Sequence, residues 1–142
     1  MTCPPLDRLC TQGGPLTPEP PDTREFDGLR QKALARLRDA GHDELSLESK
    51  FDLAYNAAHG LCNAALRHAG YRARHRYIVF QVVPHTLGLG PETVRFLSKC
   101  HELRNLGEYE GDLNVTERLV EDLLVTCRTV ARALEMLPAI LR

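Results

Sequence analysis

Apolar residues recur along most of the chain at intervals of three and four, which is the spacing of one face of an α-helix. The pattern predicts four longer helices, which begin near Asp22, Ser46, Pro91 and Asn114. Aspartate, serine and asparagine side chains cap a free helix N-terminus, and proline is tolerated at the first helical position. We expect the second helix to end at Gly70, because glycine readily takes the left-handed conformation found after helices.

The second and last helices carry the widest apolar faces. On the second, the apolar residues are Phe51, Ala54, Tyr55, Ala58, Leu61, Cys62, Ala65, Leu66 and Ala69. So many small residues on one face indicate close contact between helices. On the last, they are Val120, Leu123, Cys127, Val130, Leu134, Leu137 and Leu141, with Pro138 expected to bend the final turn. Further leucines widen this seam beyond that of a coiled coil, so the sequence predicts an all-α, compact bundle of about four to five helices.

Two segments do not follow the helical pattern. Residues 1–21 contain six of the nine prolines, and we predict an extended Pro-rich N-terminal arm that forms no helix and buries little. The helical domain would then span residues 22–142. In residues 71–90, Pro84 argues against one uninterrupted helix. The β-branched run IVFQVV is also typical of a buried strand, but no partner strand is evident, so we expect a short helix or an irregular crossing.

Composition narrows the functional classes. The 142 residues suit one domain, and a formal net charge of −1 means that any surface for nucleic acid must be local. The 5 cysteines form no C-x-x-C pair, which favours reduced core residues and a cytoplasmic location. No apolar stretch is long enough to span a bilayer, so we expect no membrane association. We also expect no metal and no cofactor, because only His59 and Cys62 have ligand-like spacing and no glycine-rich phosphate loop is present.

The most informative polar segment is RNLGEYEG, which begins at Arg104. If the preceding helix continues, His101, Asn105 and Tyr109 share one helical stripe, and Arg104 and Glu108 form a neighbouring pair at i and i+4. The planar donors of arginine suit a phosphate or a carboxylate. A helix end fastened by the arginine–glutamate pair, with the tyrosine ring packed inward, is the alternative.

A second basic segment, YRARHRY, follows Gly70. Aromatic faces beside arginines can hold single-stranded RNA, which makes Arg74 and Arg76 candidate ligand-binding residues. A solvated connection between helices is the alternative, given the nearly neutral net charge.

The stretch FDLAYNAAHGLCNAALRHAGYRAR, then a short crossing and LRNLGEYEG, resembles the HEPN superfamily (higher eukaryotes and prokaryotes nucleotide-binding). The resemblance covers about residues 24–142 and rests on the helix order, the alanine-rich second helix with its Gly-Tyr-Arg end, and the arginine–asparagine start of the motif. It implies a helical bundle that commonly dimerises, with the motifs of both subunits in a shared cleft.

The motif of HEPN ribonucleases consists of an arginine, usually a polar residue, a few further positions and a histidine. Arg104 and Asn105 match its first two residues, but Tyr109 stands where the shortest spacing would place the histidine. A tyrosine with an ordinary pKa near 10 is a poor general base at neutral pH. The resemblance therefore implies phosphate binding with ribonuclease activity weakened or absent.

Three hypotheses follow. In the first, a homodimer binds a phosphate of RNA or of a nucleotide, with Arg104, Asn105 and Glu108 as ligand-binding residues. In the second, the protein is a metal-independent, toxin-like endoribonuclease in which Arg104 stabilises charge and Tyr109 or His101 transfers protons. In the third, it is a non-catalytic interaction module that pairs with a minimal nucleotidyltransferase, as some HEPN proteins do.

Overall fold

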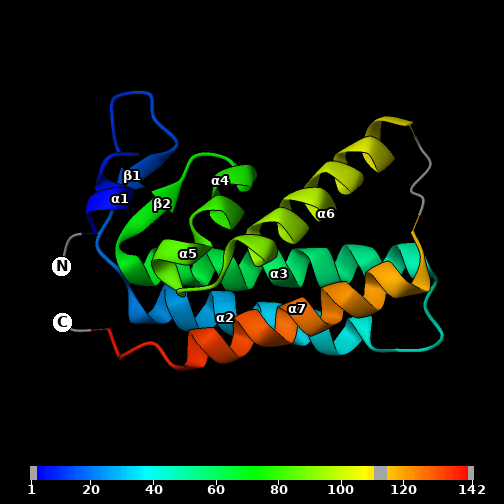
Figure 1. The fold of residues 1–142 in the computed structure, drawn as a ribbon. Helices are drawn as coiled ribbons and strands as arrows, with labels where there is room; N and C mark the ends of the chain where they lie inside the picture. Colours follow the sequence, from blue (N-terminus) through cyan, green and yellow to red (C-terminus); the bar gives the residue numbers. More distant parts are fainter. Residues whose placement is uncertain (1–2, 111–114, 141–142) are drawn as a thin grey trace.

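The computed structural model describes residues 3–110 and 115–140, and it describes residues 108–110 by their backbone only. In these ranges the chain forms seven helices and one small sheet of two strands (Figure 1). Their bounds are α1 Pro4–Asp7, β1 Leu16–Pro18, α2 Thr23–Ala40, α3 Leu47–Ala69, β2 Tyr71–Ala73, α4 Arg76–Gln81, α5 Val83–Thr86, α6 Pro91–Glu110 and α7 Glu117–Glu135. The predicted all-α fold class is confirmed, and the four longer helices lie where the apolar periodicity places them. None of the helices in these ranges combines the length and the apolar character needed to cross a bilayer.

Helix α3 is the centre of the bundle. Helices α2 and α7 run along it, and α4, α5 and α6 also contact it (Figure 1). The contact with α2 is close because small residues face each other. A Cβ atom added to Gly60 would lie 3.0 Å from the Cβ atom of Ala33. The expectation that small residues on α3 allow close helix contact is therefore confirmed.

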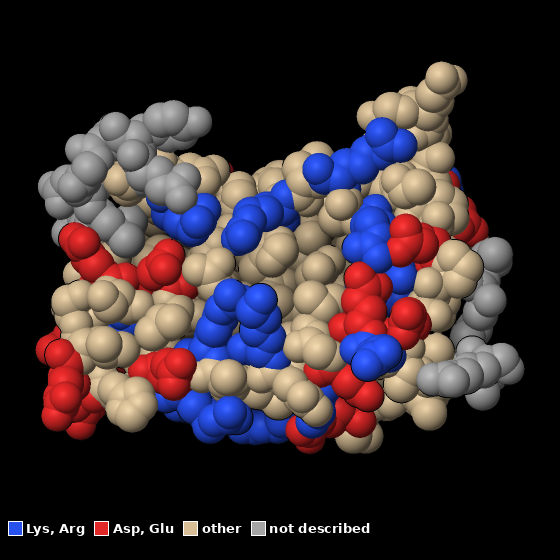
Figure 2. Space-filling model, turned by 180° about the vertical axis from the view of Figure 1, so that it is seen from behind, with Lys and Arg blue, Asp and Glu red and all other residues tan. Residues whose placement is uncertain are grey.

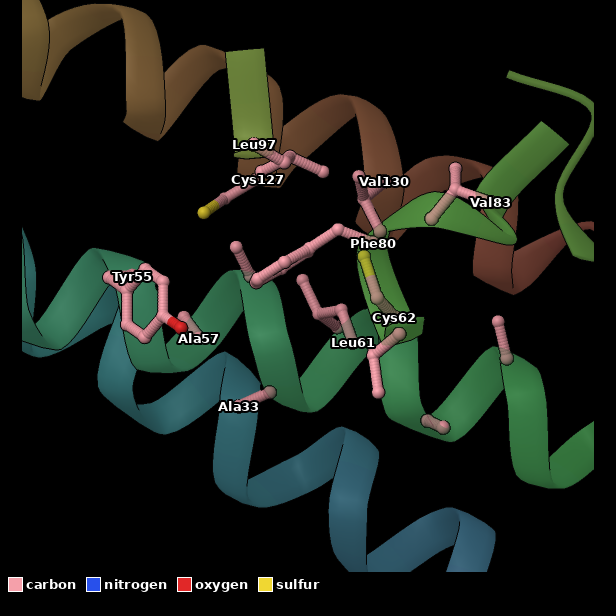
Figure 3. Packing of buried hydrophobic residues seen from close by; sticks show 14 of the residues in the cluster. Ala33, Tyr55, Ala57, Leu61, Cys62, Phe80, Val83, Leu97, Cys127 and Val130 are labelled. Carbon is pink, nitrogen blue, oxygen red and sulfur yellow. The ribbon is translucent and has the colours of Figure 1, made fainter. Parts of the chain in front are cut away.

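The core joins side chains from α3, α4, α6 and α7, as Figure 3 shows for Leu61, Phe80, Leu97 and Val130. The predicted apolar face of α7 is buried from Val120 to Leu134. Removal of these apolar side chains from water is the main favourable contribution to the stability of the bundle.

The N-terminal arm departs from the prediction. Its extended backbone is present as β1, but the expectation that it forms no helix and buries little is wrong. Helix α1 begins at Pro4, a position where the missing N–H group matters little, and Leu6 and Leu16 are fully buried. Strand β1 pairs antiparallel with β2, with Leu16 opposite Ala73. The partner strand and the buried leucines thus hold a segment whose composition favours disorder.

Arg67, in the last turn of α3, binds the N-terminal arm to this helix. It is 2% exposed and donates hydrogen bonds to the backbone oxygens of Glu19 (3.0 Å) and Pro20 (2.8 Å) and to the carboxylate of Glu25 (2.7 Å). Arg72 donates to the carboxylates of Glu19 and Glu25 as well. Glu25 therefore binds two arginines and does not complete the predicted capping box, while the Asp22 side chain alone caps α2.

The crossing after α3 consists of short elements. The expected short helix is present as α4, with α5 after it, and Pro84 lies in the first turn of α5, where proline is tolerated. Strand β2 was not predicted, because its partner is far earlier in the chain. Gly70 has a φ of 96°, as expected for a glycine that ends a helix.

Two predictions about the last helix need correction. Asn114 lies outside the described residues, and the N-cap of α7 is Thr116, whose hydroxyl accepts a hydrogen bond from the backbone N–H of Leu119 at 3.1 Å. Helix α7 ends at Glu135, so Pro138 lies beyond the helix and does not bend its final turn. This is the usual arrangement, because residues before a proline avoid the helical conformation.

Candidate functional site

Five side chains from four helices gather beside the middle of α3, and we call them the arginine–histidine cluster. They are Arg36 from α2, His59 from α3, Arg76 from α4, and His101 and Arg104 from α6. Burial lowers the pKa of His59 to about 4, and the charges of the arginines and of His101 act in the same direction. The cluster therefore combines charged guanidinium groups with a histidine that is neutral at pH 7.

One face of the molecule is locally basic although the whole chain is nearly neutral. Figure 2 shows Lys and Arg side chains across the middle of the face seen from behind, with many of the Asp and Glu side chains toward its sides. A local basic surface of this kind is the electrostatic property that an anionic ligand requires.

His101 is held on both of its ring nitrogens. Nδ1 lies 2.8 Å from the hydroxyl oxygen of Tyr55, and Nε2 lies 3.2 Å from the amide nitrogen of Asn105. An amide nitrogen only donates, so Nε2 accepts this hydrogen bond, and Nδ1 carries the proton that is donated to Tyr55. Burial lowers the pKa of His101, and the charges of Arg104 and Arg76 lower it further. The ring is therefore neutral at pH 7, and neither nitrogen is free.

Tyr55 supports both arginines that flank this histidine. Its side chain is fully buried, and the guanidinium carbon of Arg104 lies 5.1 Å from its ring centroid, a cation–π arrangement. Burial raises the pKa of Tyr55, while a hydrogen bond from Arg76 lowers it. From its place on α3, Tyr55 thus contacts residues of α4 and α6 and positions the charged groups of the site.

Arg76 and Arg104 also reach other polar side chains of α3. Arg76 donates to the amide oxygen of Asn56 at 3.3 Å, and the amide nitrogen of Asn56 is held by the backbone oxygen of Asp52 at 2.8 Å. The Nε atom of Arg104 lies 3.9 Å from the Asp52 carboxylate, whose side chain is 62% exposed. An ion pair this open to water contributes little. Arg36 makes no ion pair within the described part of the chain.

The structure brings together residues that the sequence analysis treated as two groups. Arg104, Asn105 and His101 from the polar segment lie beside Arg76 from the basic segment. The predicted stripe on α6 is confirmed for His101 and Asn105. The side chains of Glu108 and Tyr109, which were expected to complete it, lie outside the described residues.

The side chains of the basic segment have different partners in the structure. The Nε atom of Arg74 donates to the Thr17 hydroxyl at 3.3 Å, so Arg74 binds the N-terminal arm, as Arg72 also does. Tyr71 is buried and its hydroxyl donates to Asp7. His75 accepts a hydrogen bond from a backbone N–H at the start of α4. The structure places the Arg74 side chain beside the N-terminal arm, and its role in ligand binding stays a prediction.

Several residues of the site were not predicted. Tyr55 was assigned to the apolar face of α3, which is correct, but the pattern gives no sign that its hydroxyl reaches another helix. The sequence spacing indicates His59 only as a metal ligand. Its Nε2 atom is buried and makes no hydrogen bond within the described residues. Arg36 follows no motif, so only the packing of α2 against α3 places it here.

In residues 3–110 and 115–140, no three His, Cys, Asp or Glu side chains come together in an arrangement that could hold a metal ion. Burial raises the pKa of Cys62, which keeps this neighbour of His59 a neutral thiol. The chemistry of the cluster is therefore that of guanidinium donors beside neutral imidazoles. No family model matches the chain, and neither the curated proteins nor the solved structures that were compared with it include a match.

Proposed function

We propose that the protein binds a phosphate group of RNA or of a nucleotide at the arginine–histidine cluster, with ribonuclease activity weakened or absent. The observation that carries the proposal is that Arg76 from α4 and Arg104 from α6 lie against neighbouring residues of α3. Arg104 lies over the Tyr55 ring at 5.1 Å, and Arg76 donates to Asn56 at 3.3 Å. Like charges that share a site repel one another, and a bound anion removes this repulsion. Guanidinium groups offer several donors in a plane, which matches the oxygen atoms of a phosphate.

Two further features support binding over cleavage. In His101, Nε2 accepts a hydrogen bond from Asn105, and the protonated Nδ1 donates one to Tyr55. His101 therefore has no free lone pair with which to remove a proton from a ribose hydroxyl. The resemblance to the HEPN superfamily also favours a phosphate at Arg104 and Asn105. It places Tyr109 where a ribonuclease would need histidine. A metal-independent endoribonuclease would have to rearrange these contacts first.

The oligomeric state and the partner are part of the same proposal. The resemblance favours a homodimer in which two copies of Arg104 contribute to one cleft, and it leaves pairing with a nucleotidyltransferase as an alternative assembly. Light scattering on the purified protein distinguishes a dimer from a monomer. A stable monomer would contradict the shared cleft but not the cluster of one chain.

The binding site can be tested with arginine variants and a fluorescent single-stranded RNA. Because a hydrogen bond to a charged group contributes about 1.5–3 kcal/mol, we expect Arg76→Ala and Arg104→Ala each to raise Kd about ten- to hundred-fold. Arg118→Ala is the matched control. This arginine on α7 is 84% exposed, and its one partner among the described residues is Asp122, one turn away, so its loss should leave Kd unchanged. Equal Kd values for the wild type and both cluster variants would contradict the proposal, provided that circular dichroism shows all proteins folded.

A further inference from the structure

We infer that Tyr77 forms a stacking surface for a nucleobase next to the phosphate held by Arg76 and Arg104, so that the ligand is a phosphate that carries a base. The inference rests on the proposed function and specifies the chemistry of its ligand. It depends on the exposure of Tyr77, on its place in the chain and on the aromatic ring behind it.

Tyr77 is one of few large apolar side chains that remain open to solvent, with 36% of its surface exposed. It directly follows Arg76 in the first turn of α4. The next residues, Ile78, Val79 and Phe80, are buried. Helix α4 therefore turns three apolar side chains into the core and leaves one aromatic ring at the surface, beside a cationic residue of the cluster.

The exposed ring does not stand alone. Its centroid lies 5.5 Å from that of His101, with an angle of 42° between the planes. His101 is itself fixed by Tyr55 and Asn105, and its ring lies 6.2 Å from that of Phe80 in an edge-on arrangement. A tyrosine that packs against rings already held in place loses little freedom when a ligand stacks on it.

The arginine donors and the aromatic ring together determine which class of ligand fits the site. Arg76 and Arg104 supply donors for a phosphate, whereas Tyr77 offers a flat apolar face within the same part of the surface. Inorganic phosphate and phosphorylated protein side chains would use the arginines and leave this face in water. A nucleotide or a single strand of RNA would use both, since every base has a flat face that stacks on aromatic rings.

The test compares probes with and without bases. A single-stranded RNA oligomer is measured against an abasic ribose-phosphate oligomer of the same length and charge, and a nucleoside monophosphate against ribose 5-phosphate. We expect the wild type to bind the base-containing probe of at least one pair about five-fold or more tightly, because stacking of one base on an aromatic side chain has at least this effect. The first pair reports on strands and the second on free nucleotides.

Tyr77→Ala should remove this preference, lowering affinity for the base-containing probe while affinity for the abasic probe stays the same. Tyr77→Phe keeps the ring and should retain the preference. Met136→Ala removes another exposed apolar side chain, at the end of α7, and should change neither affinity.

The outcomes separate this inference from the proposed function. Equal binding of both probes by the wild type, or an equal loss of both in Tyr77→Ala, would overturn the stacking role and leave the phosphate site intact. Loss of the base preference in Tyr77→Ala with retention in Tyr77→Phe supports it. If the wild type binds none of the four probes, the proposed function fails, and the stacking inference fails with it.

Discussion

The hydroxyl oxygen of Tyr55 lies 2.8 Å from Nδ1 of His101, and this contact ties the central helix α3 to α6 at the candidate site. Tyr55 was predicted to lie in the core, and its ring does so. Its hydroxyl, however, also holds a polar side chain of the candidate site. The stability of the bundle and the geometry of the site therefore depend on the same side chain.

Tyr55→Phe should destabilise the protein although it removes a single oxygen atom. The Nδ1–H group of His101 would lose its acceptor in a partly buried place, which costs about 1–3 kcal/mol. The free energy of unfolding from urea titrations measures the effect, with the slope of the transition unchanged. Tyr77→Phe is the control, since the hydroxyl of Tyr77 makes no hydrogen bond within the described residues. An unchanged urea midpoint in Tyr55→Phe would contradict the role of this contact.

Acid should loosen the N-terminal arm. The pKa of Glu19 is lowered, chiefly by the hydrogen bond from Arg72. Burial raises the pKa of Glu25, but hydrogen bonds from Arg67 and Arg72 lower it overall. Groups with lowered folded-state pKa values stabilise the fold above their unfolded value, about 4.3 for glutamate, and this contribution is lost as the pH falls through the folded values.

Thermal unfolding measured between pH 7 and pH 3 tests the arm. The melting temperature of the wild type should fall below about pH 4.3, and Glu25→Gln should show a smaller fall over the same range because one of the titrating groups is gone. Glu48→Gln, near the start of α3, is a control that should follow the wild type, since this glutamate makes no ion pair in the described structure. Identical pH profiles for the wild type and Glu25→Gln would show that the charge of Glu25 does not stabilise the arm.

The arginine–histidine cluster should make the titration of His59 depend on ligand. Its pKa of about 4 lies below the ordinary value near 6.5, so the fold loses stability as the pH falls from about 6.5 toward 4. A bound phosphate would offset the charges of Arg76 and Arg104 and raise this pKa. Proton NMR titration of His59 and His101, with and without a nucleoside monophosphate, measures the shift. Unchanged pKa values of His59 and His101 on addition of the nucleotide would contradict a phosphate at the cluster.

Two glycines in helices should respond in opposite ways to substitution. Gly28 lies on the exposed side of α2, and a Cβ atom added there would have no other atom within 4 Å, so Gly28→Ala should stabilise the protein by about 0.5–1 kcal/mol through helix propensity. At Gly60 the added atom would lie 3.0 Å from Ala33, and Gly60→Leu should destabilise by about 1–3 kcal/mol or more because it forces α2 and α3 apart. Urea unfolding of both variants checks the pair. A stable Gly60→Leu protein would mean that the two helices are not closely packed.

The long helices could be predicted because their causes are local. Asp22 and Ser46 cap the helices that follow them, and the apolar spacing of α7 is a property of consecutive residues. The structure of the arm and of β2 could not be predicted, because Leu16 and Ala73 pair only after α3 has brought distant segments together. The capping box failed for the same reason: Glu25 finds a stronger partner in Arg67, a residue far along the chain.

The candidate site was predictable in part. Arg104, His101 and Asn105 lie on one helix, so helical spacing alone related them. The charge of Arg76 makes it a candidate from the sequence, but its place beside His101 depends on the crossing between α3 and α6, whose conformation the sequence pattern does not determine. The position of Arg74 also depends on distant segments. It follows β2 directly, and the pairing of β2 with β1 brings its side chain to Thr17.

The last prediction concerns catalysis. Purified protein should leave single-stranded RNA intact in EDTA, even at high protein concentration and long incubation. His101 cannot act as a general base while Nε2 accepts from Asn105 and Nδ1 donates to Tyr55, and its lowered pKa makes the free base weak. Gel analysis of a labelled oligomer measures cleavage, and His101→Ala purified in parallel controls for contaminating nucleases. Cleavage by the wild type that His101→Ala lacks would show that the contacts of His101 open in the complex with RNA, and that the protein is a metal-independent endoribonuclease.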